Sequence, residues 1–247
     1  MIILDDRLHI FYSTLVNNER YLSGFSTKAL GDGRDPHVIL NYFGYQKISY
    51  RKIVILDQVH STNVHFFDGE KKEPFNTIEN TDGVITNSEK VMLVVKTADC
   101  LPLLFVDKRR GLIGASHQGW QGSLKKMAVK MISAFVKKGS HAQDISVAFG
   151  PAIGVCCYDI DDNRAHQFLT EFDGYADKIF HVEKGKRHLN LARLNYLQLL
   201  EVCVKKENMD FFPFCTKCDD RHFFSFRRDG KNNYSEMFSF IMKTTYT

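Results

Sequence analysis

Val91-Met-Leu-Val-Val95, Leu101-Pro-Leu-Leu-Phe-Val106 and Leu112-Ile-Gly-Ala115 are three short apolar runs that follow one another with only a few other residues between them. Apolar runs of this length, bounded by polar or turn residues, are typical of buried strands rather than helices. Ile53-Val-Ile-Leu56 and Ser146-Val-Ala-Phe149 show the same pattern before and after them. We therefore predict a set of neighbouring buried strands in the middle of the chain.

Helical patterns lie after these runs. Residues 123–138 carry apolar side chains at helical spacing opposite a lysine face, with Ser123 as the expected N-cap and Gly139 after the expected end. Further helices are predicted over 162–172 and 190–205, and the apolar stretch 236–242 predicts a terminal strand. Because these elements do not alternate strictly, we predict a mixed α/β (α+β) fold, a layered sandwich of mixed β-sheets covered by helices.

The organisation of the chain favours one domain over residues 1–247. Its length and its 44% hydrophobic content suffice for one sizeable core. No linker or low-complexity tract divides it, and the charged stretch 68–74 is better interpreted as a surface loop than as a boundary.

The charge pattern argues against nucleic acid as a partner. The formal net charge is only +4, and the basic residues are scattered as short pairs rather than gathered in a stripe. No stretch is apolar enough for a membrane span or a secretory signal, so we expect a cytoplasmic protein with no membrane partner. The oligomeric state is left open, a homodimer being one option.

His60, Cys100 and His117 are the candidate metal ligands. Two imidazoles and one thiolate form a three-ligand zinc set, which leaves a coordination position for water or substrate. The strand pattern places Cys100 and His117 at the ends of adjacent strands and His60 just past the end of another. The alternative for Cys100 is a nucleophile that uses His117 or His60 as its base.

Six motifs occur in the order Gln58-Val-His60, Asp82-Gly-Val-Ile-Thr86, Thr97-Ala-Asp-Cys-Leu-Pro102, His117-Gln-Gly-Trp120, Gly150-Pro-Ala-Ile-Gly-Val-Cys-Cys-Tyr158 and Phe223-Phe-Ser-Phe-Arg-Arg-Asp-Gly230. In this order they resemble the YfiH/laccase-domain family, also called multicopper polyphenol oxidase-like or the purine nucleoside phosphorylase YfiH family. The similarity runs from about residue 24 to the C-terminus.

This resemblance implies a single-domain enzyme that binds one zinc ion through His60, Cys100 and His117. It implies action on purine nucleosides, either by phosphorolysis, with phosphate as the second substrate, or by adenosine deamination. The chain departs from the family pattern at Gln121, where relatives usually carry arginine, and it lacks the usual Ser-Leu-Asn-Leu-Gly segment near the N-terminus. If that arginine helps to hold phosphate, phosphorolysis is weakened here more than deamination.

Other polar and aromatic residues in these motifs are candidates for catalysis or substrate binding. Asp99 is a candidate proton carrier or partner of a metal-bound imidazole, with a turn or capping role as the alternative. Trp120 stacks a purine or serves as an ordinary core aromatic, and Gln121 lies beside it in the substrate-binding motif. Arg227 and Arg228 bind phosphate or ribose oxygens, or one of them pairs with Asp229. Alternating apolar residues there predict a strand.

The remaining cysteine motifs invite a second-zinc interpretation. Cys215-Thr-Lys-Cys218 has CxxC spacing, and Cys156 and Cys157 are adjacent. Adjacent residues in a strand point to opposite faces, so Cys156 and Cys157 are not expected to bind together, and buried thiols are the default expectation.

Zinc lowers the pKa of a bound water molecule, which suits deamination, whereas in phosphorolysis phosphate attacks the ribose anomeric carbon. Copper is the alternative metal, with phenol oxidation as the corresponding activity, although one His-Cys-His set cannot supply a multicopper cluster. A non-enzymatic alternative is an interaction module that zinc stabilises.

Overall fold

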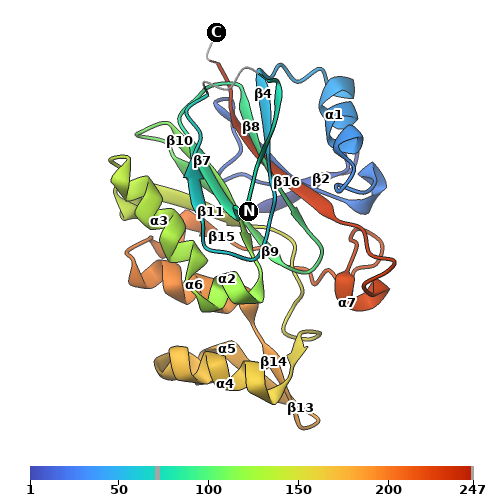
Figure 1. Cartoon of the computed structure of the whole chain (residues 1–247), viewed down its shortest axis with the longest axis vertical. Helices are drawn as coiled ribbons and strands as arrows, with labels where there is room; N and C mark the ends of the chain where they lie inside the picture. Colours follow the sequence, from blue (N-terminus) through green and yellow to red (C-terminus); the bar gives the residue numbers. More distant parts are fainter. Residues whose placement is uncertain (70–72, 246–247) are drawn as a thin grey trace.

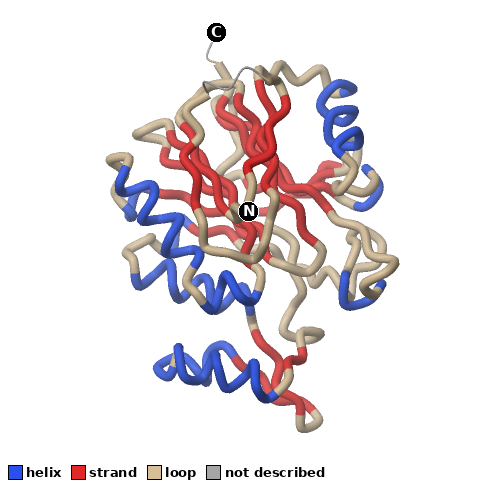
Figure 2. Tube along the Cα trace, viewed as in Figure 1, coloured by secondary structure: helices blue, strands red, loops and turns tan. Residues whose placement is uncertain are grey.

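Two β-sheets pack face to face in the computed structural model, which describes residues 1–69 and 73–245. Helices cover the outer face of each sheet, and a small third sheet with its own helices lies at one end of the molecule (Figures 1 and 2). The predicted mixed α+β sandwich is confirmed. The predicted surface loop 68–74 lies partly outside the described residues.

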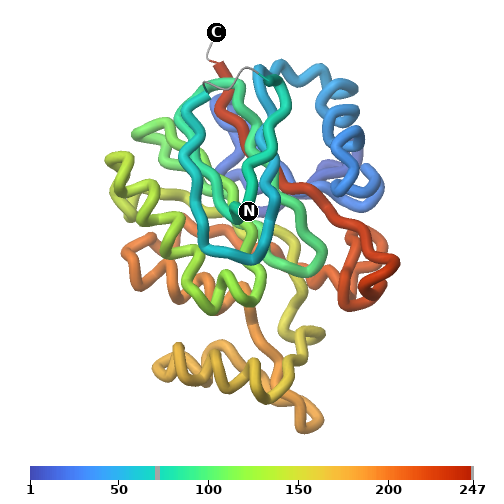
Figure 3. The backbone as a smooth tube through the Cα atoms, in the orientation of Figure 1, coloured from blue at the N-terminus to red at the C-terminus, as the bar shows by residue number. Residues whose placement is uncertain are grey.

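The seven-stranded sheet joins both ends of the chain. Its C-terminal strand pairs antiparallel with an N-terminal strand on one side and a central strand on the other (Figure 3). The strand order is β1 (Ile2–Asp5), β2 (Ile10–Ser13), β3 (Tyr21–Ser26), β16 (Met237–Lys243), β8 (Val91–Thr97), β4 (Lys52–Leu56) and β6 (Phe75–Ile78).

The six-stranded sheet contains the other predicted apolar strands. Its order is β15 (Met209–Asp210), β11 (Ile145–Phe149), β9 (Leu101–Asp107), β10 (Leu112–Gln118), β7 (Gly83–Thr86) and β5 (Val64–Phe66). The third sheet has the order β12 (Asp159–Ile160), β14 (Lys186–Leu189) and β13 (Phe180–Glu183).

Helices surround these sheets. They are α1 (Pro36–Tyr45), α2 (Trp120–Leu124), α3 (Met127–Lys137), α4 (Asp162–Glu171), α5 (Ala176–Ile179), α6 (Leu191–Glu201) and α7 (Phe226–Asp229), with 3-10 turns η1 (Lys28–Leu30), η2 (Ala142–Asp144), η3 (Asp173–Tyr175) and η4 (Lys206–Asn208). In the described ranges no helix has the length and apolarity that a bilayer span requires.

Three apolar clusters hold the layers together. Val95, Leu104 and Ile241 are fully buried members of the cluster between the two large sheets. A second cluster packs α3 and α6 against the six-stranded sheet, and a third packs α1 against the seven-stranded sheet. The strands are nearly continuously buried because both faces of each large sheet are covered. This burial explains why they appear in the sequence as unbroken apolar runs.

The predicted helix 123–138 is two helices. Lys126 adopts a left-handed backbone (φ 61°) and separates α2 from α3. Ser123 is therefore not an N-cap but a buried residue in the last turn of α2, where Asn195 donates to its hydroxyl (2.9 Å) and Gln198 to its carbonyl (2.8 Å). Side chains from α6 thus satisfy the end of α2. The predicted end is confirmed, since α3 stops at Lys137 and Gly139 has φ 89°.

The predicted strand around Arg227 is wrong. Residues 226–229 form the single-turn helix α7, because Ser225 accepts a hydrogen bond from the Arg228 N–H and its own N–H donates to Asp229. This reciprocal capping outweighs the apolar alternation that suggested a strand.

Candidate metal centre and substrate pocket

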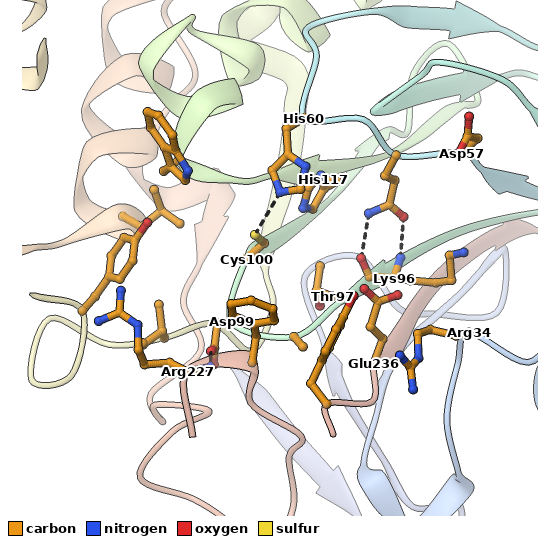
Figure 4. A pocket seen from close by; sticks show the side chains of 18 of the residues that line it. Arg34, Asp57, His60, Lys96, Thr97, Asp99, Cys100, His117, Arg227 and Glu236 are labelled. Carbon is orange, nitrogen blue, oxygen red and sulfur yellow. Dashed lines mark hydrogen bonds between the residues drawn. The ribbon is translucent and has the colours of Figure 1, made fainter. Parts of the chain in front are cut away.

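His60, Cys100 and His117, the His-Cys-His cluster, converge as predicted. Their ligand atoms all lie within 4.8 Å of one another, with Cys100 Sγ 4.0 Å from His60 Nε2. The two imidazole rings are nearly perpendicular (84°), with centroids 4.8 Å apart. In Figure 4 the three side chains point toward one another. The cluster can hold one metal ion.

Strand pairing brings two of these ligands together. Cys100 directly precedes β9, and His117 lies in β10 opposite Pro102. Both positions therefore lie at the same end of one antiparallel pair, as the sequence predicted. His60 arrives from the loop that follows β4, with a left-handed backbone (φ 59°) that turns the chain back toward the pair.

Gly119 leaves the space that His60 occupies. A β-carbon at position 119 would lie 2.5 Å from His60 Cδ2, closer than van der Waals contact permits. The glycine in the His117-Gln-Gly-Trp120 motif therefore has a steric role, because any side chain there would displace His60 from the cluster.

Asp82 holds the His117 ring and the His60 loop in place. This fully buried carboxylate lies 2.7 Å from His117 Nδ1 and accepts hydrogen bonds from the backbone N–H groups of His60 (3.1 Å) and Ser61 (2.7 Å). An ionised carboxylate only accepts, so His117 Nδ1 carries a proton, and Nε2 is the nitrogen that can bind a metal once its own proton has left. Burial raises the pKa of Asp82, but the hydrogen bonds from His117 and Ser61 outweigh it and the net shift is downward.

Sequence reasoning missed this role of Asp82. The residue opens the Asp82-Gly-Val-Ile-Thr86 motif, so the motif marked the position without indicating the contact. The expected partner of a metal-bound imidazole was Asp99, but the carboxylate in contact with His117 belongs to Asp82.

The cluster has unusual acid–base properties. Burial raises the pKa of the Cys100 thiol, yet the adjacent His117 and His60 lower it to about 7. Burial lowers the pKa of His117, yet the Cys100 thiolate and Asp82 raise it to about 10. A thiolate next to an oriented imidazole is the donor chemistry that zinc-type ions prefer. The residues therefore fit a metal with three protein ligands.

A cavity of about 640 Å³ opens beside the cluster (Figure 4). Such a volume lies within the range typical of small-molecule sites. Four cationic side chains contribute to its lining, namely Arg34, Lys96, Arg164 and Arg227, together with four aromatic ones, namely Trp120, Tyr158, Phe226 and Tyr234.

Arg164 and Trp120 form one wall of this cavity. The Arg164 guanidinium carbon lies 4.3 Å from the centre of the Trp120 ring, at a distance typical of a cation–π contact. Its Nε is buried and has no hydrogen-bond partner in the part of the chain that the structure describes. Arg164 was not predicted, because nothing in the pattern of helix α4 distinguishes it from other helical arginines.

The two predicted arginines have different environments. Arg227 lines the cavity, contacts the Tyr158 ring and forms an ion pair with Asp159. Arg228 donates to Asp229 (2.8 Å) and to the carbonyl oxygens of Thr216 (3.1 Å) and Phe223 (2.7 Å). Within the described residues, the cavity lining includes neither Arg228 nor Gln121.

Asp99 lines the cavity, but its carboxylate is heavily engaged. It accepts hydrogen bonds from the Thr216 hydroxyl (2.6 Å), the Ser225 hydroxyl (3.0 Å) and the Arg227 N–H (2.7 Å). These contacts tie the C-terminal segment to the turn that carries Cys100. They favour a positioning role, and the predicted proton transfer by Asp99 stays a prediction.

Comparison with known proteins identifies the family. The family model described as multi-copper polyphenol oxidoreductase laccase matches residues 37–244. The chain belongs to this laccase-domain family. Its structure is also similar to the crystal structure of the Bacillus licheniformis hypothetical protein YfiH, with a TM-score of 0.82, 28% identity and coverage of 91% of this chain and 93% of that one.

Relatives of this laccase-domain chain include proteins that are named for two different activities. It is 30% identical to purine nucleoside phosphorylase YlmD of Bacillus subtilis (strain 168), over 91% of this chain and 89% of the relative. It is 28% identical to adenosine deaminase RL5 of an unknown prokaryotic organism, over 73% of this chain and 71% of that protein. The resemblance stated from the sequence motifs is confirmed.

Proposed function

We propose that this chain is a zinc-dependent purine nucleoside phosphorylase. The observation that carries the proposal is the Arg164–Trp120 wall beside the His-Cys-His cluster. It places an aromatic face and a guanidinium group in one cavity with the metal-binding side chains. The names of relatives such as YlmD support the same reaction.

His60, Cys100 and His117 would hold the metal. Zinc is the ion we propose for this donor set, with Cu²⁺ as the alternative, and when bound it supplies a Lewis acid to the cavity. Asp82 keeps the proton on His117 Nδ1 and fixes the direction of the ring. The metal-facing geometry is thus set by the protein before any substrate arrives.

We assign phosphate and nucleoside to different parts of the cavity lining. We assign phosphate to Arg164 and Arg227, because guanidinium groups bind phosphate oxygens through directed hydrogen bonds. Both arginines act on Tyr158, opposing the burial that raises the pKa of its hydroxyl to about 12. The neutral Tyr158 hydroxyl can therefore donate to a substrate oxygen, and the Trp120 and Tyr158 rings offer apolar surface to a purine.

We propose that the cavity keeps enough positive charge for phosphorolysis although position 121 is glutamine. Arg164 and Arg227 line the cavity, whereas Gln121 is absent from its lining among the described residues. The expectation that phosphorolysis is weakened if an arginine at position 121 helps to hold phosphate stays a prediction. Because Arg164 and Arg227 line the cavity, we propose that phosphorolysis is the main activity.

Adenosine deamination is the second candidate, and Glu236 is the observation that favours it. Glu236 lines the cavity, and burial raises its pKa against the opposing effects of Lys96, His117 and Arg34. Zinc deaminases use a carboxyl group that is not a metal ligand as a general acid and base. Glu236 has that character here, and a relative bears the deaminase name.

The deciding experiment incubates the metal-quantified protein with inosine and adenosine, with and without phosphate. Release of hypoxanthine and adenine that requires phosphate and yields ribose 1-phosphate supports phosphorolysis. Conversion of adenosine to inosine without phosphate supports deamination, and a folded, metal-loaded protein with neither activity contradicts both.

Two variants connect the activity to the proposed site. His60→Asn removes a metal ligand while asparagine tolerates the left-handed backbone at this position. Arg187→Gln is the matched control, because Arg187 lies in β14 and forms an exposed ion pair with Asp162. We expect the first variant to be inactive and the second to behave as the unmodified protein.

A further inference from the structure

Cys156, Cys157, Cys215 and Cys218, the four-cysteine cluster, meet at one point although the two pairs are about sixty positions apart in the sequence. Their sulfur atoms all lie within 4.8 Å of one another. Cys218 Sγ is 3.3 Å from Cys157 Sγ and 3.7 Å from Cys156 Sγ. The four thiols form one group rather than two separate pairs.

This arrangement contradicts the expectation of buried thiols. Cys156 and Cys218 are exposed, and Cys157 and Cys215 are half-buried. The segment that carries Cys156 and Cys157 is a turn, closed by hydrogen bonds from the N–H groups of Cys157 and Tyr158 to the Gly154 carbonyl. The rule that adjacent residues of a strand point to opposite faces therefore does not apply here. The sulfurs of Cys156 and Cys157 both reach the same centre.

The spacing of the sulfurs fits tetrahedral coordination. Zinc–sulfur bonds of about 2.3 Å place sulfur atoms about 3.8 Å apart in a tetrahedron. The distances from Cys218 Sγ to the sulfurs of Cys157 and Cys156, 3.3 and 3.7 Å, lie near that value and well beyond the length of about 2.05 Å of a disulfide. The geometry therefore favours an ion shared by the four sulfurs over a disulfide bond between Cys218 and either Cys156 or Cys157.

The backbone around the cluster is shaped to bring thiolates together. The Gly154 N–H donates to Cys215 Sγ at 3.1 Å, a contact that stabilises a charged sulfur. A β-carbon at position 154 would lie 3.0 Å from Cys215 Cβ and 3.2 Å from Cys156 Sγ. Glycine at this position lets the two turns approach.

The cluster joins two segments that build the substrate pocket. The turn with Cys156 and Cys157 leads directly to Tyr158 in the lining. The turn with Cys215 and Cys218 contains Thr216, whose hydroxyl donates to Asp99 beside Cys100. An ion bound by both turns would fix the distance between these parts of the pocket wall.

We propose that Cys156, Cys157, Cys215 and Cys218 bind a second zinc ion, which is structural because all four of its ligands come from the protein. This ion braces the pocket from outside and does not contact substrate. The proposal does not depend on turnover, because it concerns metal content and stability. The other ion counted in the test below is the one that the proposed function assigns to the His-Cys-His cluster.

The test counts zinc in protein purified under reducing conditions. The unmodified chain is expected to contain two zinc ions. The His60→Asn/Cys100→Ser variant, which loses two ligands of the other cluster, is expected to retain one. One zinc in the unmodified chain and none in this variant would overturn the proposal, and this measurement does not require the cysteine variants to fold.

The complementary variant is Cys156→Ser/Cys218→Ser, which changes the two exposed ligands. We expect loss of one zinc and a lower Tm, with the remaining ion still bound by the His-Cys-His cluster. Retention of two zinc ions would contradict the assignment. Cys203→Ser is the matched control, because Cys203 is an exposed thiol outside both clusters, and it is expected to keep both ions and the original Tm.

Thiol titration separates the ion from a disulfide. In the unmodified chain, denatured with a chelator but without reductant, all six cysteines are expected to react. A loss of two or four reactive thiols would show disulfides within the cluster and overturn the proposal.

Discussion

The His-Cys-His cluster and the four-cysteine cluster are built on different kinds of backbone. The first uses the ends of paired strands and a buried carboxylate, Asp82, that orients one ligand. The second uses two partly exposed turns that approach each other at Gly154. Three ligands beside a cavity leave room for chemistry, whereas four ligands at the surface enclose an ion. The number of protein ligands and their surroundings therefore distinguish a catalytic metal site from a structural one.

Removing one sulfur from each cluster should give the largest contrast. Cys100→Ser is expected to lower kcat/KM for inosine by about 10³-fold or more, equivalent to about 4 kcal/mol of transition-state stabilisation. Cys218→Ser is expected to lower the Tm while leaving kcat/KM within about threefold at a temperature where it is folded. Steady-state kinetics and thermal melts on both variants make the comparison. Equal losses of activity in the two variants would contradict the assignment of a catalytic role to one cluster and a structural role to the other.

Asp82→Asn tests the support behind the open cluster. The asparagine amide can donate an N–H to His117 Nδ1, which would favour the tautomer whose proton is on Nε2, the nitrogen that binds the metal. We therefore expect the metal affinity of the His-Cys-His cluster to fall about 10–100-fold. Competition with a chromophoric chelator measures this affinity in the Cys156→Ser/Cys218→Ser background, where only one site remains. Unchanged affinity would show that Asp82 serves only the fold of the His60 loop.

Arg164→Gln tests the phosphate assignment. A charge-assisted hydrogen bond contributes about 1.5–3 kcal/mol, so the KM for phosphate is expected to rise about 10–100-fold while the KM for inosine changes little. Initial rates over a grid of both substrates separate the two constants. A rise confined to the nucleoside KM would move Arg164 to the purine subsite.

Features of the fold and of the site could be predicted from the sequence where a local run of residues encodes them. The strands 91–95, 101–106 and 112–115 were predictable because their burial on both faces leaves unbroken apolar runs. The three metal ligands were found because each lies in a distinctive motif. Arg164 and the contact of Asp82 with His117 were not, because pairing between distant segments creates them.

The errors have the same origin. Residues 226–229 were predicted as a strand, but the Arg227 N–H donates to Asp99, 128 positions away, and Ser225 caps the turn. Ser123 was predicted as a cap, but contacts from α6 account for its position. The four-cysteine cluster depends on two turns whose approach no local pattern encodes. That one domain spans residues 1–247 stays a prediction.

The pKa values of the open cluster predict a pH-dependent metal affinity. Metal binding needs the Cys100 thiolate and an unprotonated His117 Nε2, and the pKa values of these groups are about 7 and about 10. At pH 8 binding therefore displaces about one proton from this pair, and at pH 6 about two, so the affinity falls more steeply below pH 7. Calorimetry in buffers of different ionisation enthalpy counts the protons. A release that does not change as the pH passes through 7 would contradict the thiolate assignment.

Gln121→Arg should have the smallest effect. Because Gln121 lies outside the described cavity lining, restoring the arginine usual among relatives is expected to change kcat/KM for phosphate by less than about threefold, a difference below about 1 kcal/mol. A gain of tenfold or more would show that position 121 reaches the phosphate in the working enzyme.

The proposed function depends most directly on an open coordination position at the His-Cys-His cluster. X-ray absorption at the zinc edge of the Cys156→Ser/Cys218→Ser variant measures it. We predict one sulfur at about 2.3 Å from the zinc and three lighter neighbours at about 2.0–2.1 Å, two from imidazole and one exchangeable. The exchangeable neighbour should be replaced by an added anion. A shell dominated by sulfur, or one that no added anion alters, would contradict it.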